Sequence, residues 1–176
     1  MNSRRTMIVL NLLGGVAVLA SYAWGLLGFP ETRGQIWGGI PESMRSLYTT
    51  SMLTAAGGYF FFTGYFLFQI DPQQLEDRGP FRFSLINWSY LLVLAPSALW
   101  LPLTFSMIES PGPFLWFMIR LVLTLTALGS LGLLYAVLRL RREGHPLFFW
   151  LALAGILAFN LQTTVLDAIV WTAYYP

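Results

Sequence analysis

Residues 114–138 read FLWFMIRLVLTLTALGSLGLLYAVL, an apolar run in which Arg120 is the only charged side chain. Residues 146–171 read PLFFWLALAGILAFNLQTTVLDAIVW, and Asp167 is the only charged side chain of this second run. A helix needs about 20 apolar residues to cross the hydrocarbon core of a bilayer. Both runs are longer than this. They predict two membrane-spanning helices, each with one ionisable group, and such a group is a candidate functional residue.

The composition of the whole chain agrees with a membrane protein. Of the 176 residues, 56% are hydrophobic and 10% are charged, whereas about 25% are charged in soluble domains. The first apolar run follows Arg4 and Arg5, but it exceeds the roughly 7–15 residues of a signal-peptide core, so it predicts a span. We therefore expect an all-α integral membrane protein with a single transmembrane domain over residues 1–176. The five predicted spans are residues 7–29, 47–70, 83–108, 114–138 and 146–174.

Arginine is distributed unevenly between the segments that connect these spans. Five alternating spans place the N-terminus and the connections 71–82 and 139–145 on one side of the membrane. The other side carries Arg33 and Arg45. Cytoplasmic loops are enriched in basic residues, so we expect a cytoplasmic N-terminus and an outside C-terminus, in a bacterial-type inner membrane or its equivalent. The basic residues of the first side are Arg4, Arg5, Arg78, Arg82, Arg139, Arg141 and Arg142.

The residue types that are missing exclude several kinds of chemistry. The chain has no cysteine and no lysine, and His145 is its only histidine. Thiolate catalysis, iron–sulfur ligation, Schiff-base formation and multi-histidine metal sites are therefore excluded for a single chain. No nucleophile–base pair is recognisable, so an enzyme is the less favoured interpretation. We expect no catalytic residues, no cofactor, no metal site and no nucleic-acid partner.

The two intramembrane charges are predicted to lie at the same depth. Arg120 precedes Arg142 by 22 residues, and Asp167 follows Glu143 by 24 residues. At a rise of 1.5 Å per residue the two depths agree to within about 3 Å. Charges within a membrane usually pair with one another. We therefore expect an Arg120–Asp167 ion pair, which either locks the hairpin of the last two spans or forms the centre of a site.

Other polar and aromatic residues accompany this pair. Asp167 belongs to a series with spacings of four, three and four residues, which place its members on one face of an α-helix. Polar groups in a span must face protein or water, because lipid cannot satisfy them. The predicted site lies in the outer half of the last three spans. Its candidate ligand- or ion-binding residues are Arg120, Asp167, Asn160, Thr164, Thr124, Glu109, Trp100 and Trp171.

These residues support two hypotheses about function. In the first, the protein binds or transports a small molecule or ion, such as a small hydrophobic or anionic ligand. Arg120 then binds an anionic group, or holds Asp167 until a ligand or proton displaces it. In the second, the protein is an accessory or assembly subunit of a larger membrane complex. The charges then orient helices or meet those of a partner, which is another membrane protein or a second copy of this chain. In both hypotheses the lipid bilayer surrounds the protein.

Small residues are frequent in the second span, where Gly57 and Gly58 are adjacent. Such residues let helix backbones approach closely. We expect them to mark a helix contact, with a thinned wall beside a ligand as the alternative.

The layout of the chain is similar to that of the translocator-protein family, whose members bind porphyrins and sterols. The similarity consists of five spans, the length and the tryptophan content. The loop that corresponds to that family's Trp-x-Pro-Pro signature reads GQIWGGIP over residues 34–41. The signature is absent, so the similarity implies no site residue.

Overall fold

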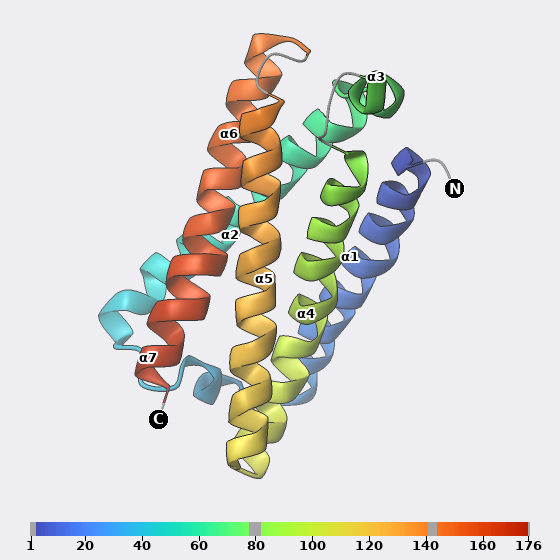
Figure 1. The fold of residues 1–176 in the computed structure, drawn as a ribbon. Coiled ribbons are helices and arrows are strands. Elements are labelled where there is room, and N and C mark those ends of the chain that lie inside the picture. Colours follow the sequence, from blue (N-terminus) through green and yellow to red (C-terminus); the bar gives the residue numbers. More distant parts are fainter. Residues whose placement is uncertain (1–2, 78–81, 141–143, 176) are drawn as a thin grey trace.

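The computed structural model describes residues 3–77, 82–140 and 144–175, and within these ranges the protein is helical and has no β-strand. Figure 1 shows an elongated bundle with the N-terminus at one end and the C-terminus at the other. The elements are α1 (Ser3–Gly28), η1 (Arg33–Trp37), α2 (Glu42–Phe68), α3 (Pro72–Asp77), α4 (Phe83–Glu109), α5 (Pro113–Arg139), α6 (Pro146–Asn160), η2 (Leu161–Trp171) and α7 (Thr172–Tyr174).

Four helical segments of the described chain are long and apolar enough to cross a membrane. They are α1, α4, α5 and the combined segment Pro146–Tyr174. The prediction of an all-helical chain of membrane-spanning type is therefore confirmed at this level. The predicted span 47–70 forms α2, which is 27 residues long but is not one of the four. Residues 47–58 of this segment are rich in serine, threonine and glycine, which lowers the mean hydropathy of the helix.

The helices pack in an order that differs from their order in the chain. α4 lies between α1 and α5, α5 contacts α6 and η2, and α2 packs along α6. Gly58 of α2 and Gly155 of α6 allow this last contact, because a Cβ atom added at Gly58 would lie 2.5 Å from the carbonyl oxygen of Gly155. The predicted role of Gly58 in helix packing is confirmed. Gly57 has open space around its Cα and makes no such contact.

A large apolar core fills the N-terminal end of the bundle. Hydrogen bonds between helices accompany it: the hydroxyls of Thr63 and Tyr90 lie 2.7 Å apart, and the Tyr65 hydroxyl donates to the carbonyl oxygen of Leu140. Buried aromatic and aliphatic side chains of α2, α4, α5 and α6 meet in this core, so these helices are held together here by apolar burial. The buried members from α1, α2 and α4 are Met7, Phe62, Tyr65, Phe66, Phe83, Ile86, Tyr90, Val93 and Leu94.

A second cluster, which we call the aromatic cluster, fills the C-terminal end. There the η1 loop contacts the end of the chain: Trp171 Nε1 donates to the carbonyl oxygen of Ile36 at 2.9 Å, and the Gly39 amide donates to that of Tyr174 at 3.0 Å. The η1 segment that ends at Trp37 is a 3-10 helix. The aromatic cluster contains buried Ile40, Tyr48, Ile119, Leu123, Leu166 and Trp171, with part-buried Trp37, Trp100, Trp116 and Tyr175 packed against them.

The two ends of the bundle collect the segments expected on the two sides of a membrane. In Figure 1 the N-terminus, α3 and the start of α6 lie at one end, and η1, the α4–α5 turn and the C-terminus lie at the other. Among the arginines predicted for the first end, Arg4, Arg5, Arg82 and Arg139 are described. Arg78, Arg141 and Arg142 lie outside the described residues. Glu143, the reference residue for the predicted depth of Asp167, also lies outside them.

Candidate functional site

The segment that carries Asp167 is a π-helix, Leu161–Trp171, and not the regular α-helix expected for a single span. Hydrogen bonds in a π-helix join residues five apart, and such segments are rare and frequent at functional sites. The wider turn brings residues i and i+5 together. Gln162 and Asp167 are such a pair, and Gln162 Nε2 donates to Asp167 Oδ1 at 2.7 Å.

Asp167 lies inside the bundle but keeps part of its surface accessible. Its hydrogen-bond partner, Gln162, is neutral and only 5% exposed. Tyr22 of α1 and Tyr48 of α2 are close enough to interact electrostatically with the carboxylate. The Tyr48 hydroxyl donates to the carbonyl oxygen of Leu166 at 2.9 Å, which ties α2 to η2 beside Asp167. The carboxylate therefore lies within electrostatic range of tyrosines from α1 and α2.

Trp171, four residues after Asp167, belongs to a group of packed aromatic rings. The ring centroids of Trp171 and Trp100 are 5.8 Å apart, and those of Trp100 and Tyr22 are 6.1 Å apart. Trp171 also contacts Trp116 at 6.2 Å and Tyr175 at 4.5 Å. The rings form one connected group from α1 to the C-terminus. We use the name Asp167 site for Asp167, its hydrogen-bond partner Gln162, the tyrosines Tyr22 and Tyr48, and the tryptophans Trp100 and Trp171.

Two buried polar atoms of the Asp167 site have no hydrogen-bond partner among the described residues. They are the acceptor Gln162 Oε1 and the donor Trp100 Nε1. The assignment of the Gln162 amide is fixed by its neighbour, because the atom facing a carboxylate oxygen must be a donor. Buried polar atoms are usually satisfied, and leaving one unpaired costs about 1–3 kcal/mol. The two atoms therefore mark a place where water or a ligand would be stabilised.

The expected Arg120–Asp167 ion pair is not present. Arg120 lies on the exposed face of α5, whereas the preceding Ile119 is fully buried, and its guanidinium lies 6.0 Å from the ring centroid of Trp116. Arg45 forms an ion pair with Glu42 at 3.7 Å, whereas no such contact joins Arg120 to Asp167. Equal depth was the basis of the prediction, but depth does not fix the direction in which a side chain leaves its helix.

Two other predicted residues lie away from the Asp167 site. Thr124 is exposed on the same face of α5 as Arg120, and its hydroxyl donates to the Arg120 carbonyl oxygen at 2.8 Å. Glu109 is exposed at the last residue of α4. Of the predicted residues, Trp171 lies on the same helical segment as Asp167, and Trp100 packs against Trp171.

Asn160 and Thr164 belong to a polar network in which the central residue is Ser130 of α5. Asn160 Nδ2 donates to the Ser130 carbonyl oxygen at 3.1 Å, and the Ser130 hydroxyl lies 3.2 Å from Asn160 Oδ1. Thr163 donates to the Ser130 hydroxyl at 2.9 Å. These bonds connect α5 to the α6–η2 junction. Sequence reasoning missed Ser130, although a serine between two glycines in a span, Gly129 and Gly132, was an available signal.

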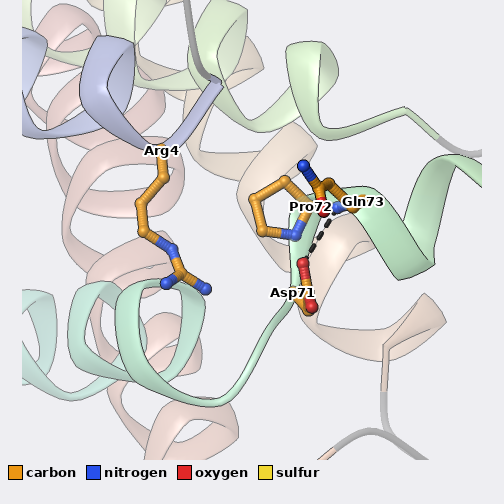
Figure 2. A pocket seen from close by; sticks show the side chains of 4 residues that line it. All are labelled: Arg4, Asp71, Pro72 and Gln73. Carbon is orange, nitrogen blue, oxygen red and sulfur yellow. Dashed lines mark hydrogen bonds between the residues drawn. The ribbon is translucent and has the colours of Figure 1, made fainter.

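A pocket of about 210 Å³ lies at the opposite end of the bundle. Arg4 lines it on α1, and Asp71, Pro72 and Gln73 line it at the start of α3 (Figure 2). Arg4 donates to the carbonyl oxygen of Ile70 at 2.7 Å. None of the predicted site residues lines this pocket, so it is separate from the Asp167 site.

Comparison of the chain with protein families, with curated proteins and with solved structures gives no match. The function is therefore inferred from the site alone. Among the described residues, no group of three or more His, Asp or Glu side chains is placed to hold a metal ion.

Proposed function

We propose that the protein is a five-span membrane protein that binds a small molecule or ion at the Asp167 site. In this proposal α2 crosses the membrane in addition to the four apolar segments, which makes five spans. The N-terminus is then cytoplasmic and the C-terminus is outside. The arrangement of the ends supports the proposal, because Arg4, Arg5, Arg82 and Arg139 gather at one end and basic residues favour the cytoplasmic side. The Asp167 site then lies in the outer half of the membrane.

The observation that carries the proposal is the set of unsatisfied polar groups around Asp167. The carboxylate has a neutral partner, and Gln162 Oε1 and Trp100 Nε1 have none. Polar groups within a span are costly and usually mark binding or transport pathways. An occupant with both hydrogen-bond donors and acceptors would satisfy all three groups together. Occupancy by a ligand is the step common to binding and to transport.

Native mass spectrometry of the protein extracted gently from its own membrane tests this proposal. The wild-type protein is expected to carry a reproducible small-molecule adduct. Asp167→Asn should lose the adduct, because it removes the charge but preserves the shape. Glu109→Gln is the matched control, since Glu109 is an exposed carboxylate outside the site, and it should keep the adduct. An adduct of equal intensity in all three proteins, or none in any, would contradict the proposal.

A second candidate function is an accessory subunit of a membrane complex, and the position of Arg120 favours it. Arg120 and Phe117 are both exposed on α5, and a charge within a span is normally paired. A carboxylate of a partner protein would supply that pair. In the same mass spectra, this function predicts a stoichiometric protein partner that is lost in Arg120→Gln and retained in Arg139→Gln.

A further inference from the structure

We infer that the ligand of the Asp167 site is a small organic cation, either a protonated amine or a quaternary ammonium. The inference rests on the proposed function and specifies the ligand class for the same site. It replaces the anionic ligand expected from the sequence, because that expectation depended on Arg120. Arg120 is exposed on α5, its guanidinium lies 6.0 Å from the ring centroid of Trp116, and it forms no ion pair with Asp167.

The charge of the site favours a cation. The described residues place no basic side chain in ion-pair contact with Asp167, whose hydrogen bond comes from the neutral Gln162 amide. Charges interact strongly where water is scarce and the dielectric constant is low. A carboxylate held in such a place attracts a monovalent cation and repels an anion. Binding a cation would also relieve the cost of keeping an unpaired charge in the bundle.

The rings around the carboxylate favour an organic cation. Trp100 and Trp171 lie 5.8 Å apart, and Tyr22 extends the group on the α1 side. The face of an aromatic ring carries partial negative charge, and groups of rings bind alkylammonium ions at short range. Tryptophan is the strongest of the ring types for this contact. Asp167 shares a helical segment with Trp171, and Trp100 and Tyr22 are joined to Trp171 through ring contacts. This region therefore offers both a charge and an apolar surface suited to an alkylammonium ion.

The two unpartnered atoms add hydrogen-bonding positions. Gln162 Oε1 is carried by the amide carbon whose nitrogen bonds Asp167, so this acceptor lies beside the carboxylate. An ammonium N–H would donate to it. Trp100 Nε1 is a donor and would bind an oxygen atom carried by the ligand. An amine with a nearby hydroxyl or carbonyl oxygen would satisfy both atoms.

Isothermal titration of the purified full-length protein in detergent tests the inference. The probes are tetramethylammonium, choline and ethanolamine as chlorides, with sodium acetate as the anionic probe and sodium chloride as the ionic-strength control. We expect saturable binding of at least one organic cation and none of acetate. Asp167→Asn should weaken this binding by about tenfold or more, because a tenfold change corresponds to only 1.4 kcal/mol. Glu109→Gln should leave it unchanged.

A second pair of variants tests the contribution of the rings. Trp100→Leu should weaken binding of tetramethylammonium at least about threefold, because it removes a ring whose face attracts the cation. Trp100→Phe retains a ring and should recover most of the affinity for this probe, which has no oxygen to bind Nε1. Phe117→Leu is the control, because Phe117 is an exposed ring outside the site. Thermal unfolding without probe checks that each variant is folded.

The possible failures are distinguishable. If the native adduct is lost in Asp167→Asn but no organic cation binds, the proposed function stands and the cation inference is overturned. Binding of acetate, or equal binding of cations to wild type and Asp167→Asn, also overturns it. If neither an adduct nor cation binding is found, both proposals fail.

Discussion

Replacing Gly58 by leucine is expected to separate α2 from α6 and to destabilise the protein by about 3 kcal/mol, at the upper end for overpacked interiors. A Cβ atom at Gly58 would lie 2.5 Å from the carbonyl oxygen and 2.8 Å from the Cα atom of Gly155. Both are backbone atoms, so the neighbour cannot rotate aside as a side chain would. The two helices would have to move apart along their contact.

The adjacent glycine provides a matched control. A Cβ atom at Gly57 would meet nothing within 4 Å, so Gly57→Leu should change the stability by no more than about 0.5 kcal/mol. Both substitutions have the same effect on composition and hydropathy. Equilibrium unfolding in mixed detergent with increasing sodium dodecyl sulfate measures the difference. Equal losses of stability for the two variants would show that α2 and α6 do not meet through Gly58.

Replacing Gln162 by leucine is expected to cost about 1.5–3 kcal/mol, the range for a hydrogen bond to a charged group. Leucine fills much of the space of the glutamine, which is 5% exposed, so loss of packing adds little. The main effect is that Asp167 loses the amide that donates to it at 2.7 Å. The carboxylate then remains within the bundle without a hydrogen-bond donor, and an uncompensated charge inside a protein lowers the stability of the fold.

A double-mutant cycle separates this effect from packing. In an Asp167→Leu background there is no carboxylate to leave unpaired, so Gln162→Leu should cost clearly less there than in the wild-type background. The same detergent unfolding measures all four proteins. If Gln162→Leu lowers the free energy of unfolding equally in both backgrounds, the two side chains are not coupled. The hydrogen bond between Gln162 and Asp167 then does not stabilise the protein.

The helices were largely predictable because hydropathy and helix-end signals are local. The predicted spans 83–108 and 114–138 correspond to α4, Phe83–Glu109, and α5, Pro113–Arg139. Pro113 follows Gly112 and occupies the first turn of its helix, where the missing amide hydrogen costs nothing. These boundaries need no knowledge of the rest of the fold.

The site was predictable only in part, because it depends on helix rotation and on helix type. Asp167, Trp100 and Trp171 were identified, but Arg120 was assigned to the wrong side of α5. An apolar face toward lipid and an apolar face toward protein look alike in sequence. The π-helix also changed the spacing, so that Gln162 meets Asp167 at i+5. Tyr22 and Tyr48 come from other helices, and no local signal connects them to Asp167.

Substituted-cysteine labelling tests whether Asp167 lines the proposed site and can be reached from the outer side of the membrane. The chain has no cysteine, so Asp167→Cys introduces a single thiol. A small water-soluble cationic methanethiosulfonate reagent is added to intact cells. Ser130→Cys is the buried control, because Ser130 is 0% exposed in the neighbouring network. His145→Cys is the control for side, since His145 is exposed at the N-terminal end of the bundle.

We expect the thiol of Asp167→Cys to react with the reagent from outside without permeabilisation, and to react faster than the thiol of Ser130→Cys. His145→Cys should react only after the membrane is permeabilised. If Asp167→Cys does not react from outside, or reacts no faster than Ser130→Cys, the carboxylate is closed within the bundle and the proposed binding site is contradicted.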